Sequence, residues 1–114
     1  MTKETKTTGT DLQLQTYQTA LQECMKEIGM FSKNNALIFM EPILDYQRIY
    51  LKTMKEGQEA LENGTDIDQV TKILNLAARY ATMRDSALRA LSIEPNQILR
   101  RGQQTQEEED LLKW

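Results

Sequence analysis

Histidine is absent from this chain of 114 residues, and cysteine occurs once, at Cys24. Without histidine, one subunit cannot form a Ser-His-Asp triad, a Cys-His pair, an H-E-x-x-H zinc site or an imidazole pH switch. A single cysteine cannot form an internal disulfide or a thiol cluster for zinc, and it fits a reducing compartment. We therefore predict a protein that is not an enzyme, has no catalytic residues, and takes no cofactor and no metal.

The sequence also lacks a long apolar run. Its longest strongly apolar stretch, residues 36–40, is followed directly by Glu41 and Pro42, whereas a membrane-spanning helix needs about 20 apolar residues. The first ten residues are rich in lysine and threonine and have no apolar core of the kind that a signal peptide requires. We expect residues 1–10 to be a flexible N-terminus, no membrane partner, and a cytoplasmic location.

Charge is unevenly distributed, although the formal net charge is only -3. Residues 1–71 carry 7 basic and 11 acidic side chains, residues 72–101 carry 6 basic against 2 acidic, and residues 102–114 carry 1 basic against 4 acidic. The basic segment is compatible with an element that faces a polyanion. The simpler explanation is a solvated helix face, because arginine is a good helix former.

The first amphipathic segment is predicted to be a helix from about Asp11 to Ile28. Its apolar residues recur at intervals of three and four, which places them on one stripe. Cys24 lies on this stripe, so we interpret it as a small buried apolar side chain and not as a reactive thiol. Gly29 is placed to end the helix.

Pro42 lies inside the second apolar stripe, which runs from about Asn35 to Asn63. Because proline lacks an N–H, either the helix continues through a kink or a new helix begins at Glu41 with Pro42 in its first turn. We favour a kinked continuation, since residues 36–40 already have helical spacing to the next apolar residues. Gly57 follows the stripe and indicates a close approach between helices.

Asn63 and Gly64 are predicted to end this helix, and a third helix runs from about Thr65 to Leu91 after a segment with capping-box spacing. The short connection between two long helices predicts an antiparallel hairpin. Two long helices expose more apolar surface than the first helix can cover, so we also expect a homo-oligomer. The residues expected between subunits are Tyr50, Met54, Leu61, Val70 or Ile73.

Pro95 is predicted to open a short helix that ends near Arg101, followed by a polar spacer over residues 102–106. An acidic run and then Leu111, Leu112 and Trp114 close the sequence, and this tail either docks into a basic, grooved protein partner or folds back onto the hairpin. The expected fold is all-α. Residues 11–101 form a single helical domain with a long antiparallel hairpin, an N-terminal helix and a short C-terminal helix, and residues 102–114 form an acidic tail.

The second half of the chain, about residues 43–101, resembles the small subunit of phage terminases. The resemblance is carried by one helix with Tyr46, Tyr50 and Leu51, the Asn63-Gly64 break, a second helix with Arg84, Leu88 and Leu91, then Ile93-Glu94-Pro95 and Arg100-Arg101. One branch of that family ends its helix pair in a Gly-Leu-Thr-Pro-x-x-Arg element. Ile93 and Pro95 match its Leu and Pro, whereas Ser92, Glu94 and Ile98 stand at its Gly, Thr and Arg positions.

The resemblance implies a non-catalytic, ring-forming protein that recognises viral double-stranded DNA and delivers it to an ATP-driven large motor subunit. In this interpretation the acidic tail contacts the motor subunit, and arginines contact phosphates, which supply affinity without sequence information. The implied DNA-contacting residues are Arg79, Arg84, Arg89, Arg100 and Arg101.

The alternative is a helical adaptor or chaperone that binds a protein partner and no nucleic acid. Its support is the net negative charge, the acidic tail and a series of methionines, which adapt to varied partners but also fill ordinary cores. These methionines are Met25, Met30, Met40 and Met54. Salt-dependent retention on DNA separates the two alternatives.

Overall fold

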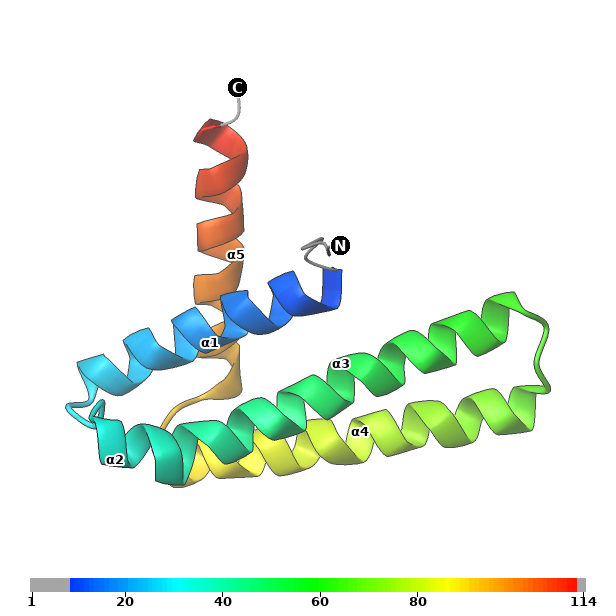
Figure 1. Cartoon of the computed structure of the whole chain (residues 1–114), viewed down its shortest axis with the longest axis horizontal. Coiled ribbons are helices and arrows are strands. Elements are labelled where there is room, and N and C mark those ends of the chain that lie inside the picture. Colours follow the sequence, from blue (N-terminus) through cyan, green and yellow to red (C-terminus); the bar gives the residue numbers. More distant parts are fainter. Residues whose placement is uncertain (1–8, 113–114) are drawn as a thin grey trace, which may run out of the picture.

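The chain folds as an assembly of helices (Figure 1). The computed structural model describes residues 9–112 and, among their side chains, those of residues 9–103. The elements are α1 (Gly9–Glu27), α2 (Lys33–Asn35), the π-helical turn η1 (Ala36–Met40), α3 (Glu41–Glu62), α4 (Ile67–Ala90) and α5 (Pro95–Leu112). The described residues contain no strand, so the predicted all-α class is confirmed. None of their helices has both the length and the apolar character needed to cross a bilayer.

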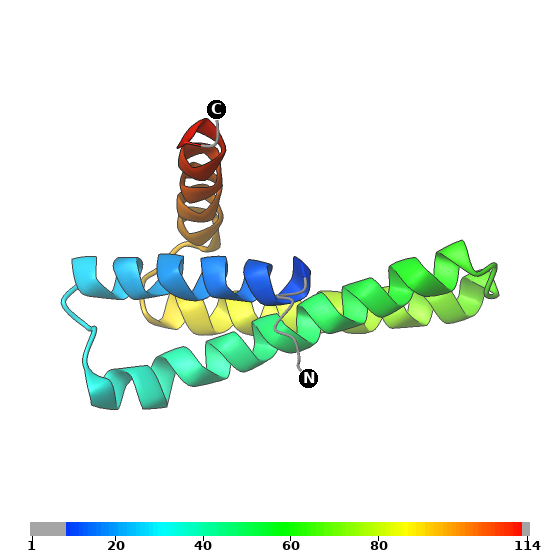
Figure 2. The ribbon, with the colours of Figure 1, turned by 45° about the horizontal axis from the view of Figure 1, so that its top comes forward.

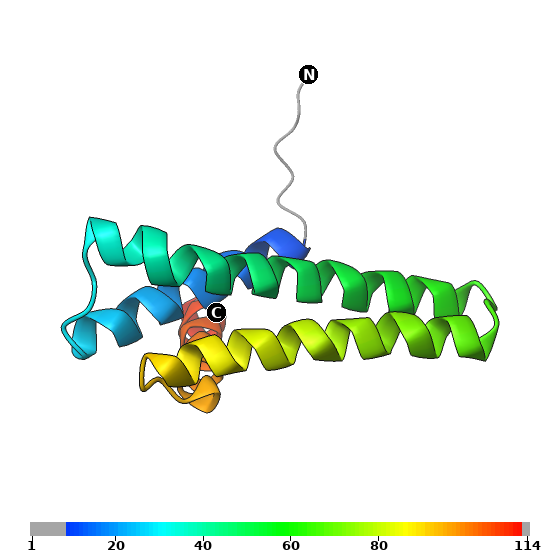
Figure 3. The same ribbon diagram turned by 90° about the horizontal axis from the view of Figure 1, so that it is seen from below.

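Helices α3 and α4 lie side by side in opposite chain directions, joined by residues 63–66 (Figures 1 and 3). Helix α1 packs along one part of this pair, and α5 contacts α1 and then projects away from the other helices (Figure 2). Beyond the first residues of α1 the pair continues alone to its turn. The molecule therefore consists of a four-helix junction and a two-helix arm.

The hydrophobic core lies at the junction, where α1, the start of α3, the end of α4 and the start of α5 meet. The largest side chains with less than 2% exposure are Leu21, Met25, Ile43, Leu88, Ile93, Ile98 and Val70. Cys24 is also buried, as predicted. In the arm, a Cβ atom on Gly57 would lie 2.6 Å from Cδ2 of Leu74. This confirms that Gly57 marks a close approach of two helices.

Three helices end in the same way, with one residue in the left-handed conformation. These residues are Gly29, Gly64 and Ser92, with φ of 73°, 74° and 62°. In each case the next backbone N–H donates to the carbonyl five residues earlier, at 2.8, 2.9 and 3.0 Å. This is the Schellman pattern, in which glycine is preferred because it has no Cβ. Ser92 adopts the conformation without that advantage.

Pro42 is accommodated by the π-helical turn that precedes it. The helix begins at Lys33, where the Ser32 hydroxyl accepts a hydrogen bond from the Asn35 N–H at 3.1 Å, and it runs without a break into α3. At the turn, the Glu41 N–H donates to the carbonyl of Ala36, five residues earlier. The two alternatives considered for Pro42 are thus combined, because the helix continues through residues 36–40 while Pro42 lies in the first turn of α3.

Two details predicted around the later helices are wrong. Helix α5 continues from Pro95 to Leu112, without the break expected over residues 102–106. Gly102 instead lies against α1, where a Cβ atom would be 3.2 Å from Cγ2 of Thr16, and the glutamines and glutamates that follow favour a helix. The predicted boundary at residue 102 therefore falls inside one helix. At α4 the N-cap is Asp66 and its side chain makes no capping hydrogen bond, so the expected capping box does not form.

Candidate interaction surfaces

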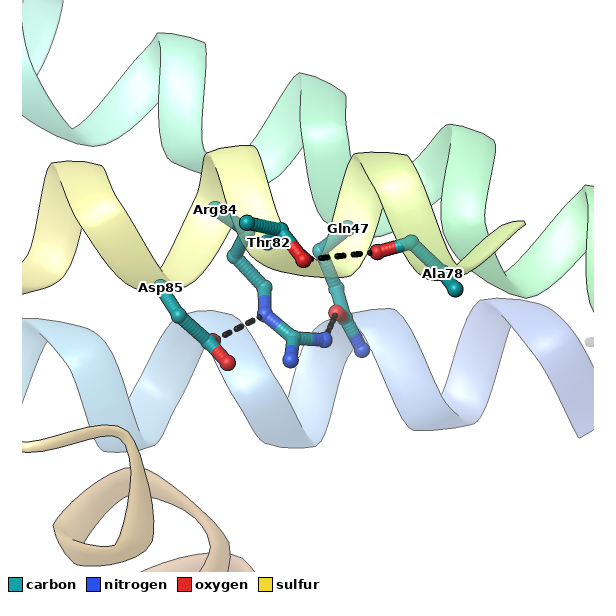
Figure 4. A network of polar contacts seen from close by, with 5 residues as sticks. All are labelled: Gln47, Ala78, Thr82, Arg84 and Asp85. Carbon is teal, nitrogen blue, oxygen red and sulfur yellow. Dashed lines mark hydrogen bonds and ion pairs between the residues drawn. The ribbon is translucent and has the colours of Figure 1, made fainter. Parts of the chain in front are cut away.

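Arg84 points from α4 into the space between α1 and α3 and has only 12% of its side chain exposed. Its Nη1 donates to Oε1 of Gln47 on α3 at 2.6 Å, and its Nε donates to Oδ1 of Asp85 at 2.8 Å (Figure 4). The guanidinium carbon also lies 5.1 Å from the ring centre of Tyr50 and 5.9 Å from that of Tyr17. Arg84 is therefore an internal link between helices, which corrects its assignment to a phosphate-contacting surface.

Tyr17 adds an unusual feature to this cluster. Its hydroxyl is buried and has no hydrogen-bond partner among the described residues. Burial raises the pKa of the Tyr17 phenol far above its ordinary value, and the nearby Arg84 guanidinium offsets this only in part. The folded protein therefore keeps this phenol in its neutral form.

A groove of about 480 Å³ opens above the cluster, between α1, α3 and α5. Arg84 is the one charged residue among its described lining residues, and the remainder are apolar, hydroxyl or amide side chains and one glycine. These residues are Leu12, Gln13, Thr16, Tyr17, Gln47, Tyr50, Leu51, Ile98, Leu99, Gly102 and Gln103. Among the described lining residues there is thus no carboxylate or thiol that would act as a base or nucleophile.

The other four arginines implied by the resemblance fall into two groups. Arg79, Arg89 and Arg100 are exposed and form no ion pair with any side chain of residues 9–103. Arg101 is half-buried and pairs with Glu27 of α1, next to Cys24. Burial raises the pKa of the Cys24 thiol, and Arg101 lowers it in part. Hence three of the five arginines are free to meet an external anion.

The residues expected between subunits have different surroundings in the structure. Val70 is 2% exposed and packed within its own chain, so its assignment to an intersubunit contact is wrong. Tyr50 contacts Arg84 inside the cluster. Leu61, at the end of the arm, is 57% exposed.

Residues 28–39 contain further exposed apolar side chains, for which no contact between subunits was predicted. They lie in the connection after α1 and in η1, and we call them the tip patch. The tip patch consists of Ile28, Phe31, Leu37, Ile38 and Phe39. Leu37 and Ile38 are 60% and 61% exposed. The run of apolar residues from Leu37 to Phe39 could have predicted this exposure, because three consecutive residues of one helix cannot all face a core on one side.

The tail residues of the docking prediction lie outside this description. Leu111 and Leu112 belong to the last turn of α5, but their side chains are not among those described, and Trp114 lies beyond the described residues.

No protein-family model, curated protein or solved structure matches the chain.

Proposed function

We propose that this protein is a non-catalytic, self-associating component of viral DNA packaging that resembles a terminase small subunit. The observation that carries the proposal is the exposure of Arg79, Arg89 and Arg100 without ion pairs on α4 and α5. Arginine binds phosphate through its planar fork of N–H donors. An exposed guanidinium without an ion pair can do so without first breaking a contact inside the protein.

The conformation of Ser92 also supports the proposal. In the family element, glycine stands at the position that Ser92 occupies here. Ser92 has φ of 62°, the left-handed conformation that glycine adopts most readily, and the Ile93 N–H closes the helix end on Leu88. The backbone at this point therefore has a conformation that a glycine would favour, although the residue differs.

Three free arginines per chain set the expected strength of DNA binding. The slope of log affinity against log salt is about 0.9 per phosphate contact, so one chain gives a slope of about 2.7 at most. Such a contact is weak and independent of sequence. Self-association would raise the affinity for DNA by bringing several chains onto one duplex.

Salt-dependent retention on double-stranded DNA tests the proposal. We expect the parent protein to bind at low salt, and the variant Arg79→Gln/Arg89→Gln/Arg100→Gln to lose nearly all of the salt slope. The matched control is Arg48→Gln, which removes an exposed arginine that already pairs with Asp45 at 2.7 Å. The control should keep most of the affinity. Absence of retention by the parent protein at low salt would overturn the proposal.

The second candidate is a helical adaptor that binds a protein partner, and the exposed tip patch favours it. In this function the protein does not bind DNA at any salt concentration. Removal of residues 111–114 then abolishes capture of the partner, whereas in the packaging function the same truncation weakens binding of the large motor subunit and leaves DNA retention intact.

A further inference from the structure

The tip patch is an unusual surface for an isolated protein. Three consecutive large apolar residues, Leu37 to Phe39, are each at least 37% exposed, and in the connection between α1 and α2 Phe31 and Ile28 are 38% and 42% exposed. Runs of exposed apolar residues are avoided on protein surfaces unless another surface covers them. We therefore expect another surface to cover these residues.

The π-helical turn lies within the tip patch. Its hydrogen bond from the Glu41 N–H to the Ala36 carbonyl encloses one residue more than an α-helical turn. Around this turn Met40 and Ile43 face the core, at 7% and 1% exposure, while Leu37 and Ile38 are exposed. Such turns are frequently found at functional positions.

Charges on the same face are arranged symmetrically about Leu37. Lys33 lies four residues before Leu37 and Glu41 four residues after it, about one helical turn away on either side. All three side chains are exposed. If two copies of this helix cross in opposite directions at Leu37, each Lys33 comes to lie beside the Glu41 of the other copy. The surface is thus complementary to itself, which is the requirement for a two-fold interface.

We propose that the tip patch is the interface of a symmetric dimer, in which two copies of the chain pack antiparallel across a two-fold axis at Leu37. Leu37 lies at the buried centre of the contact, and the two reciprocal Lys33–Glu41 pairs fix the direction of packing. A membrane surface fits less well, because Glu27 and Glu41 accompany Lys26 and Lys33 around the patch, whereas helices that bind anionic lipid carry a predominantly basic polar face. The inference rests on the self-association included in the proposed function, and it assigns to it one two-fold contact between two copies instead of the ring that the resemblance implies.

Charge reversal tests the two-fold arrangement directly. Lys33→Glu and Glu41→Lys each convert both ion pairs into like-charge contacts, so each variant should dimerise roughly tenfold to a hundredfold more weakly in sedimentation equilibrium. An equimolar mixture of the two variants should form a heterodimer of parental affinity, because every contact across the axis is again between opposite charges. The double variant Lys33→Glu/Glu41→Lys should also recover the parental affinity.

Two further variants test the apolar centre. Leu37→Asp should give a monomer, while Ile67→Asp, which places the same charge at an apolar residue of similar exposure on the arm, should leave the dimer unchanged. Thermal melts followed by circular dichroism establish that each variant is folded.

A monomeric parent protein, charge-reversal variants that dimerise like the parent, or a mixture that fails to recover dimerisation would each overturn the inference. A dimer that does not bind DNA would leave this inference standing and defeat the packaging proposal. Salt-dependent DNA binding by a monomeric parent would overturn this inference and support the packaging proposal.

Discussion

Replacement of Arg84 by methionine should destabilise the protein by about 3 kcal/mol, although the substitution removes no apolar core residue. Methionine keeps the length of the side chain and its contact with Tyr50, so the loss reports mainly on the guanidinium. The charge-assisted bond to Gln47 at 2.6 Å contributes about 1.5–3 kcal/mol. The pair with Asp85 contributes about 0.5–1 kcal/mol, because that carboxylate keeps 24% exposure and is partly solvated without its partner. Loss of the cation–π contact adds about 0.5–1 kcal/mol.

Urea denaturation followed by circular dichroism measures this change as a shift of the midpoint at constant slope. A domain of this length has a total stability on the order of 10 kcal/mol, so a loss of about 3 kcal/mol is well resolved. The double-mutant cycle with Gln47→Leu isolates the bond between Arg84 and Gln47, and the coupling energy should exceed about 1 kcal/mol.

A loss below about 1 kcal/mol, with zero coupling to Gln47, would contradict the internal role of Arg84. The guanidinium would then be free to turn outward toward a phosphate, as the sequence resemblance implied. Arg79→Met serves as the matched control, because Arg79 is an exposed arginine on the same helix, and its replacement should change the stability by less than about 0.5 kcal/mol.

Three other outcomes follow from the geometry. Tyr17→Phe should raise the free energy of unfolding by about 1 kcal/mol, since it removes a buried hydroxyl that has no partner, and a loss of stability in urea denaturation would show that the hydroxyl is satisfied. The free energy of unfolding should fall as pH rises above 9.0, the ordinary pKa of a cysteine thiol, because Cys24 and Tyr17 have raised pKa values in the folded state and ionise more readily in the unfolded chain. The slope of the free energy of unfolding against pH approaches about 1.36 kcal/mol per pH unit for each group. Tyr17→Phe should reduce this slope above pH 10, and an unchanged slope in this variant would refute the contribution of the Tyr17 phenol. Ser92→Gly should stabilise the protein by up to about 1 kcal/mol by relieving a left-handed residue, whereas Ser92→Ala should not, and equal midpoints for the two variants would count against strain at this position.

Apolar periodicity was sufficient to predict the helices and much of the core. The stripe of the first helix places Tyr17, Leu21 and Cys24 in the core, but its last member, Ile28, is 42% exposed because α1 already ends at Glu27. Periodicity indicates which side of a helix is apolar, but it does not predict where the element that covers this side ends.

The break expected at Gly102 was wrong for a related reason. A glycine that ends a helix and a glycine that allows a neighbouring helix to approach closely look alike in sequence.

The Arg84 cluster could have been anticipated from the same stripes. Arg84 lies seven residues after Ala77 and four before Leu88, both of which have 0% exposure, so it occupies a core position of α4. Gln47 holds the corresponding place on α3, four residues after Ile43. A polar residue at a core position of each of two adjacent helices predicts a hydrogen bond between them. The tip patch had no equivalent signal for its partner, because coverage by a second chain is a property of the assembly.

The position of the tip patch links the two proposals quantitatively. It involves residues 28–41 and contains no residue of α4 or α5, so the proposed dimer leaves Arg79, Arg89 and Arg100 of both copies exposed. A dimer that lays both copies on one duplex then has six free guanidinium groups in place of three, and its slope of log affinity against log salt should rise from about 2.7 to about 5.4. We therefore expect the Leu37→Asp monomer to keep DNA binding but with about half of the parental slope, measured by fluorescence anisotropy over a salt series. An unchanged slope in a variant shown to be monomeric would mean that the two copies of the dimer do not bind the same duplex.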